Sequence, residues 1–281
     1  MKRSQLVIAS LALLLAVASS VQAANVNSQL FVGNRNQLSD NSAEYLSVDL
    51  NANGILEVGD SIRGIIDINT VENLDFASPT NFLGGGSGNN ELAGVFEITC
   101  VDSVPVGMGL NFVTFAPSAA FQTQYGAGAM VALYEDPVVQ FTRSGAAIPV
   151  LEANVTNGVL YQVFGFSAAP GTTIGWTALA PTNLVAAGAT PPGVNAGMVN
   201  FALNLLANPG GLALGLVANG FGGVSNLAGS GNILGTGGVP TPYMVYDNFD
   251  AVIQPVPVPA SMLLLGSGLI GLVGFRRKAR K

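Results

Sequence analysis

Histidine is absent from the whole 281-residue chain, lysine occurs only at positions 2, 278 and 281, and Cys100 is the one cysteine. The lack of histidine excludes Ser-His-Asp triads and histidine metal sites. Without lysine between the two ends, Schiff-base catalysis and the lysine of a phosphate-binding loop are excluded as well. A single cysteine cannot form an intrachain disulfide. Cys100 alternates with Phe96 and Ile98, which predicts a buried structural thiol.

Basic residues are also scarce in the middle of the chain. Residues 24–255 hold all 16 acidic residues but only Arg35, Arg63 and Arg143, which gives this body a net charge of −13. Phosphate recognition needs lysine and arginine, so nucleic acid is a poor partner and metal cations are better ones. No charged residue at all occurs between Glu152 and Asp247.

The segment 256–281 has three parts in a fixed order. A proline-rich motif comes first, then an apolar run predicted to be a helix over residues 260–275, then a basic tail over 276–281. This helix is about 24 Å long at about 1.5 Å per residue, shorter than a hydrocarbon core of about 30 Å. The basic tail is expected on the cytoplasmic side. The motif is Val256, Pro257, Val258, Pro259, Ala260 and Ser261, and the basic residues are Arg276, Arg277, Lys278, Arg280 and Lys281.

This three-part tail resembles the PEP-CTERM sorting signal of Gram-negative bacteria. Its family pattern reads Val-Pro-Glu-Pro-Ala-Ser, and Val258 replaces the glutamate here. The resemblance implies an exosortase-type membrane peptidase as partner, a transient or anchored stay in the inner membrane, and delivery of the body to the cell surface or outside. For many such proteins it also implies association with exopolysaccharide, or cell aggregation. The alternative is a plain C-terminal anchor.

The N-terminus agrees with export. Lys2 and Arg3 precede an apolar core, and Val21-Gln22-Ala23 forms a small-residue cleavage site. This pattern is typical of a secretory signal peptide over residues 1–23.

The body reads as β structure throughout. Short runs of alternating residues separated by Gly, Pro and Asn turns predict an all-β, antiparallel β-sandwich or jelly roll, with helices mainly at the termini. Asn157-Gly158 between two β-rich runs, 150–155 and 159–164, predicts a hairpin. Helical spacing also allows a short helix over 196–207.

One loop has the spacing of a calcium site. Residues 49–60 place oxygen side chains at positions 1, 3 and 5, Gly54 at position 6 and an acid at position 12, and so resemble EF-hand and dockerin-type loops. The expected ligands of one weakly bound calcium ion are Asp49, Asn51, Asn53, the Ile55 carbonyl, Glu57 and Asp60. The alternative is a simple Asn53-Gly54 turn.

No catalytic constellation stands out in the sequence. The leading hypothesis is a non-catalytic surface or extracellular-matrix protein sorted by an exosortase-type system. The alternative is a secreted carbohydrate-active enzyme that uses carboxylates such as Glu135, Asp136 and Glu152.

Overall fold

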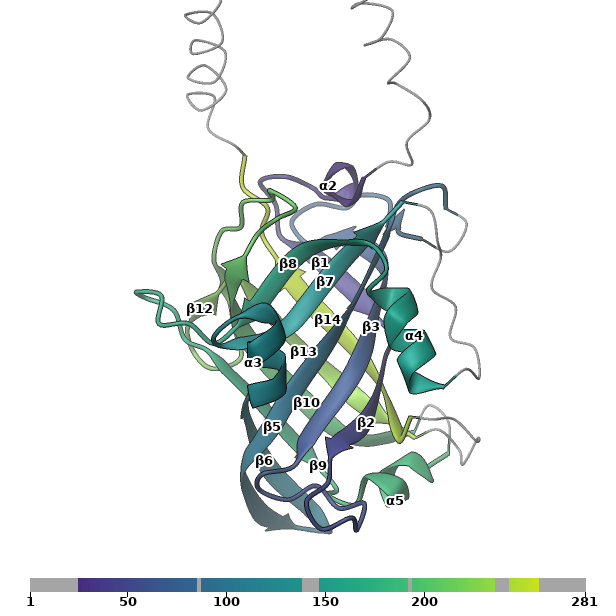
Figure 1. Ribbon diagram of the computed structural model, residues 1–281. Coiled ribbons are helices and arrows are strands. Elements are labelled where there is room, and N and C mark those ends of the chain that lie inside the picture. The colour runs from purple at the N-terminus through teal and green to yellow at the C-terminus, as the bar shows by residue number, and fades with distance from the viewer. Residues whose placement is uncertain (1–24, 85–86, 138–146, 192–193, 236–242, 258–281) are drawn as a thin grey trace, which may run out of the picture.

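The computed structural model describes residues 25–84, 87–137, 147–191, 194–235 and 243–257 (Figure 1). The helices are α2 (Val26–Gln29), α3 (Ala119–Tyr125), α4 (Ile148–Val155) and α5 (Leu184–Gly188). The strands are β1 (Asn36–Asp40), β2 (Ser42–Val48), β3 (Ser61–Asn73), β4 (Asn81–Phe82), β5 (Glu91–Gly107), β6 (Leu110–Pro117), β7 (Ala129–Asp136), β8 (Val159–Gly165), β9 (Gly175–Ala180), β10 (Asn195–Ala207), β11 (Val217–Ala218), β12 (Val224–Ser225), β13 (Leu227–Leu234) and β14 (Val245–Ile253).

All but β11 and β12 belong to one 12-stranded antiparallel sheet, and this sheet closes on itself. The path runs from β14 through β13 and β10 to β8, β7 and β5, and then through β3 to β1 and β2, which pair again with β14. Closure leaves few unpaired strand edges. The predicted all-β, antiparallel body is confirmed, but one closed sheet takes the place of the two facing sheets of a sandwich.

Long strands make the closure possible because they change partners along their length. The first half of β5 pairs with β7, and its second half pairs with β6. β10 likewise pairs first with β9 and then with β8. β1 and β2 lie in line along the same edges of β3 and β14.

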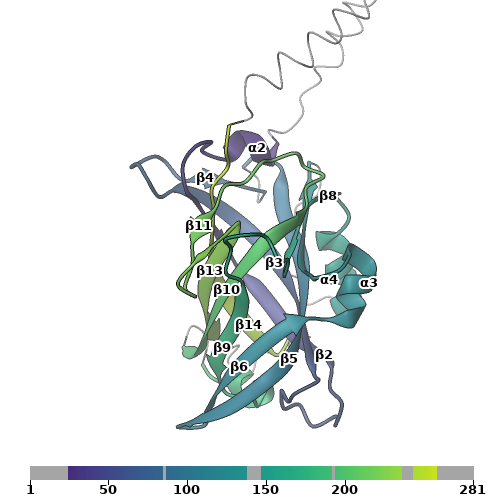
Figure 2. The same ribbon diagram turned by 90° about the vertical axis from the view of Figure 1, so that its left-hand side faces the viewer.

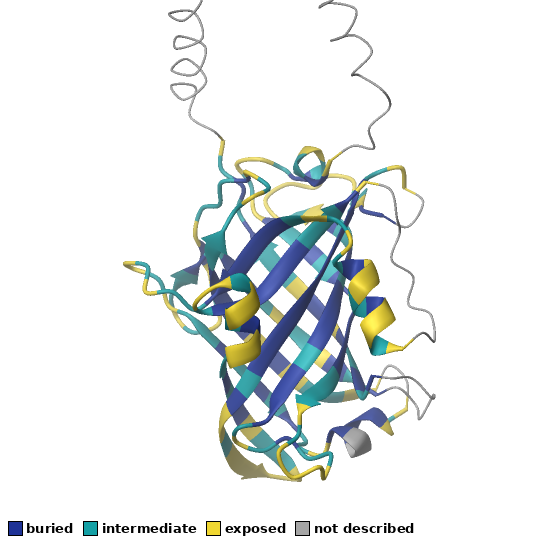
Figure 3. Ribbon diagram, viewed as in Figure 1, coloured by how far each residue is buried: buried dark blue, intermediate teal, exposed yellow. Residues whose placement is uncertain are grey.

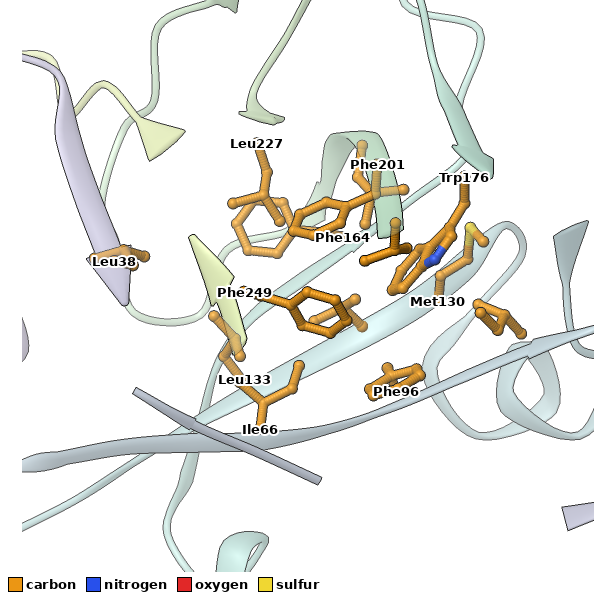
Figure 4. Close-up of a cluster of buried hydrophobic side chains, with 14 of the residues drawn as sticks. Leu38, Ile66, Phe96, Met130, Leu133, Phe164, Trp176, Phe201, Leu227 and Phe249 are labelled. Carbon is orange, nitrogen blue, oxygen red and sulfur yellow. The ribbon is translucent and has the colours of Figure 1, made fainter. Parts of the chain in front are cut away.

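The interior of the closed sheet is filled by a large hydrophobic cluster (Figure 4). Trp176 stacks on Phe96 with ring centroids 5.5 Å apart and lies 5.1 Å from Phe201. Phe201 meets Phe249 edge-on at 5.7 Å. Such offset and edge-on pairs add stability beyond the area they bury. Cys100 belongs to this cluster and is fully buried, which confirms its prediction as a structural thiol.

A second cluster lies on the outer face, under α3 and α4. Alternation on β3 explains the two cores, because Ile62 and Ile66 belong to the interior cluster while Ile65 packs outside with Phe121 of α3 and Leu151 of α4. The other sides of both helices are exposed (Figure 3). The expectation that helices stay mainly at the termini is therefore wrong for α3, α4 and α5.

Two further sequence interpretations are corrected by the structure. Residues 196–207 form strand β10 because Val199, Phe201 and Leu203 also alternate, and that face fills the interior. Residues 150–155 form most of α4 in place of a hairpin strand. Pro149 stands in its first turn, and Leu151 and Val155 bury one helical face.

Candidate functional site

The sorting motif leaves the body from a well-fixed point at one end of the closed sheet. Backbone N–H groups hold the chain there: Gly33 donates to the Pro255 carbonyl at 2.7 Å, Gly215 to Gln254 at 2.7 Å, and Val256 to Ala213 at 2.9 Å. Pro255 is buried, whereas Pro257 is exposed.

The first described residues lie at the same end of the molecule, where α2 caps the sheet (Figure 1). Asn25 caps α2 by accepting from the Ser28 N–H, and the Val26 N–H donates to Glu135 Oε1 at 2.8 Å. Asn27 Nδ2 donates to the Gly210 carbonyl at 3.1 Å. These contacts tie the start of the body to β7 and to the loop after β10, which also holds Gln254 and Val256.

α2 and β4 lie at the same end of the molecule (Figure 2). Residues of both elements line an open groove of about 520 Å³. This size falls within the range of ligand-binding clefts, about 300–1,000 Å³. None of the described residues that line it is charged, and most carry amides or hydroxyls. The lining includes the side chains of Gln29, Asn69, Thr80, Asn81, Phe82 and Asn89.

The amides of the groove are held in place by the backbone. Asn81 Nδ2 donates to the Gln29 carbonyl and Asn89 Nδ2 donates to the Phe82 carbonyl, both at 2.7 Å. An amide has two N–H donors and an oxygen that can accept twice, so each keeps further capacity for a ligand. Phe82 is 59% exposed and adds an aromatic surface to this polar wall. Sequence reasoning missed this groove, although asparagines crowded around one phenylalanine were a visible signal.

The predicted calcium loop is an ordered turn between β2 and β3. Asp49 accepts from the Asn53 N–H at 3.2 Å and from the Gly54 N–H at 2.7 Å, and these bonds lower the pKa of its carboxyl. Asp60 is buried and accepts from the N–H groups of Leu50 and Glu57, each at 2.8 Å. Both carboxylates therefore face inward across the loop.

The other residues predicted as calcium ligands also make contacts within the loop. Asn53 Oδ1 accepts from the Ile55 N–H at 2.7 Å, and Asn51 Nδ2 donates to Glu57 Oε2 at 2.5 Å. Gly54 has φ +71°, a conformation that favours glycine. Across the described part of the chain, no group of three or more Asp, Glu, Cys or His residues is placed to hold a metal ion. Any ion here would depend on the amide and carbonyl oxygens as well as on the acids.

The carboxylates named for a hydrolytic enzyme have structural partners. Glu135 Oε1 accepts from the Val26 N–H and from Asn90 Nδ2. Glu152 forms an ion pair with Arg63, 2.8 Å from its Nε. Asp136 is buried next to Glu135 in β7.

Sequence reasoning also missed a buried pair of acids inside the sheet, Glu44 of β2 and Asp247 of β14. Both line an interior cavity together with Trp176. The alternation of β2 and β14 could have indicated that they face inward, but only the pairing of these two strands brings them together.

Comparison with known proteins identifies the end of the chain. Residues 255–278 match the family model of the PEP-CTERM protein-sorting motif. The chain is thus an exported protein with a PEP-CTERM sorting signal, which is recognised by an exosortase, a membrane protein, and directs it toward the cell surface. No curated protein and no solved structure matches the chain.

Of the sorting motif, Val256 and Pro257 are described. Val258, Pro259, Ala260 and Ser261 lie outside the described residues, as do the predicted helix over 260–275, the basic residues 276–281 and the signal peptide over 1–23. Within the described ranges, no helix is long and apolar enough to cross a membrane.

Proposed function

We propose that the exported body is a non-catalytic surface or extracellular-matrix protein that associates with neutral exopolysaccharide. The observation that carries the proposal is the uncharged groove beside α2. Sugar hydroxyls both donate and accept hydrogen bonds, as the side-chain amides of Asn81 and Asn89 do. The apolar C–H face of a sugar ring can pack on the exposed ring of Phe82.

Charge supports a neutral partner over an acidic one. The body carries a net charge of −13, so an anionic polymer would be repelled over its surface. The groove itself offers no cation among its described lining residues that would offset this repulsion. Arg63, which belongs to β3, is already paired with Glu97 and Glu152.

The test is co-sedimentation of the exported protein with purified cell-surface polysaccharide, with a neutral dextran and with an acidic polysaccharide as comparisons. We expect binding to the neutral polymers, and a loss of at least about tenfold in Phe82→Ala, equivalent to roughly 1.4 kcal/mol. Phe76→Ala is the matched control, because Phe76 is 67% exposed but is not among the residues lining the groove. The association is refuted if the same fraction of wild-type protein sediments when the polysaccharide is left out.

Sorting is tested separately in cells with and without the exosortase. We expect the protein to lose residues beyond the sorting motif and to reach the surface only when the peptidase is present. Replacing Pro257 and Pro259 with alanine would extend the predicted helix into the motif and block processing. If surface protein keeps its tail, the plain-anchor alternative is correct.

We further propose that the loop over residues 49–60 binds calcium weakly. Inward-facing carboxylates of Asp49 and Asp60 support this, because a carboxylate oxygen that accepts one N–H bond keeps a second lone pair. Asn51, Asn53, Glu57 and the Ile55 carbonyl would complete an all-oxygen set of the kind that calcium prefers. Bound calcium would then stabilise the junction between β2 and β3.

A further inference from the structure

Two carboxyl groups meet inside the closed sheet where it is joined by β2 and β14. Val245 lies opposite Glu44 and Ser42 lies opposite Asp247, so the two acids are diagonal neighbours on one face. Glu44 is 4% exposed and Asp247 is 5% exposed. Both line a cavity of about 40 Å³, large enough for a water molecule but not for a larger ligand.

The surroundings of this pair hold no compensating cation within the described residues. β3 contributes Ile62, β13 contributes Ile233 and α5 contributes Leu184 to the same cavity. Two further acids lie close along the chain: the Asp40 carboxylate of β1 accepts from Ser42 Oγ and from the Phe249 N–H, and the Asp250 carboxylate of β14 accepts from Ser39 Oγ. The phenols of Tyr45 and Tyr246 are on residues adjacent to Glu44 and Asp247. β8, β9, β10, β13 and α5 come from the segment without charged residues, so they supply none.

One oxygen of the pair has no partner. Asp247 Oδ1 is buried without a hydrogen bond, while the Asp247 carboxyl is hydrogen-bonded to Glu44. A hydrogen bond between two carboxyl groups requires that one of them holds a proton. Burial raises the pKa of Asp247 to about 6, because the apolar interior disfavours its charged form.

The seam that carries the pair is short. β2 and β14 share three residue pairs, Val245–Glu44, Tyr246–Ala43 and Asp247–Ser42, whereas β13 and β14 are paired from Leu227 to Leu234. The two strands that pair with β14 on this side, β1 and β2, are also separated by a break at Asn41. Local opening at such a seam breaks fewer hydrogen bonds than opening elsewhere.

From this arrangement we infer that the β2–β14 seam is a pH-responsive closure of the sheet. It is shut while Glu44 and Asp247 share one proton, and it opens when that proton is lost and two buried negative charges face each other. This inference concerns the body alone and does not depend on the proposed glycan binding.

The direction of the effect follows from the pKa of Asp247. A carboxyl that holds its proton more tightly in the closed state stabilises that state at low pH, and the stabilisation is lost as the pH rises through about 6. The difference between the ordinary value of 3.8 and about 6 changes the opening equilibrium about 100-fold from below pH 3.8 to above pH 6, and about tenfold of this change falls between pH 5 and pH 8.

Hydrogen exchange of the full chain in detergent tests the inference at pH 5 and pH 8, with rates corrected for the intrinsic effect of pH. We expect the seam amides, residues 42–44 and 245–247, to exchange up to about tenfold faster at pH 8 than at pH 5. The amides that join β10 and β13 serve as the internal reference. Trp176 lines the same cavity and lies in the interior cluster (Figure 4). Acrylamide should therefore quench its fluorescence more strongly at pH 8 than at pH 5.

Asp247→Asn and Glu44→Gln are the decisive variants. An amide donates a hydrogen bond to the remaining carboxylate without needing a proton, so either variant should keep the seam shut at both pH values. If one variant does not fold, the other has the same amide–carboxylate pair and replaces it. The inference is overturned if the wild-type seam shows no extra exchange at pH 8, if both variants keep it, or if the β10–β13 amides rise equally.

Discussion

Arg63 offers the sharpest test of how the outer helices are held to the sheet. Its Nη1 lies 2.8 Å from Glu97 Oε2 on β5, and its Nε lies 2.8 Å from Glu152 Oε1 on α4. The guanidinium also stands 5.8 Å from the ring centre of Phe121 on α3. Tyr45 completes the cluster by donating its hydroxyl to Glu152 at 2.9 Å. One side chain therefore joins β3, β5, α3 and α4.

Replacing Arg63 with leucine would remove the cation that pairs with Glu97, although the Glu97 side chain is only 5% exposed. Although burial favours the neutral form, the bonds to Glu152 and Glu97 hold the pKa of Arg63 above its ordinary value, so the guanidinium keeps its charge. Removing one partner of a buried ion pair typically costs about 3–5 kcal/mol. We expect Arg63→Leu to lose stability in that range.

The assay is urea unfolding of the full chain in detergent, followed by the fluorescence of Trp176. Arg35→Leu is the matched control, because the Arg35 side chain is 52% exposed in its pair with Asp75 and should contribute less than about 1 kcal/mol. A double variant that also converts Glu97 to leucine should recover much of the loss. The reasoning is refuted if Arg63→Leu is no more destabilising than Arg35→Leu.

Three further predictions concern the loop, the sheet and the thiol. Millimolar calcium, but not magnesium, should raise the melting temperature of the full chain, and Asp49→Ala should abolish that rise; an unchanged midpoint in wild type means that the loop is only a turn. Gly94→Ala should destabilise the fold by about 1–3 kcal/mol in the same urea assay, because the new methyl group would overlap the Ala132 carbonyl oxygen, whereas the open position Gly220 should tolerate alanine. Cys100 should react with a thiol reagent only after unfolding, since it is fully buried and its pKa is raised to about 11 by that burial; labelling of the native protein would contradict the interior placement of β5.

Prediction from the sequence succeeded where the apolar residues of a segment fitted only one kind of secondary structure. In β3, the isoleucines at 62 and 66 could only alternate toward a common face, and the structure buries them in the interior. The environment of Cys100 followed from the same rule on β5. In both strands the local pattern and the long-range pairing agree, so local reasoning succeeded.

In other segments the apolar residues fit both the helical spacing and the alternation of a strand, and only contacts with the rest of the fold decided between the two. β10 contains residues at helical spacing, but Val199, Phe201 and Leu203 also alternate, and pairing with β13 selects the strand. In α4, the helical spacing of Leu151 and Val155 dominates over their β propensity, because the outer face of the sheet offers a site to bury them.

The sites themselves depended on contacts between distant parts of the chain. Closure of the sheet brings Glu44 next to Asp247, and no local pattern announces a pairing across that separation. The groove likewise joins Gln29 to the segment around Asn81. Residue type indicated which side chains could bind a ligand, but contacts between distant segments of the chain determined which of them meet.

The fixed exit of the chain also limits where a membrane peptidase can cut. Pro255 is buried and its carbonyl accepts from Gly33, while the Val256 N–H donates to Ala213, so these residues cannot enter a protease as an extended strand without breaking that pairing. Accessible substrate begins at the exposed Pro257. A cut at or beyond this residue leaves every backbone bond that closes the sheet intact, so the body keeps its fold after sorting. The groove lies at the same end, because Asn81 is bonded to Gln29 of α2, so a cut at or beyond Pro257 also leaves the described residues that line it intact.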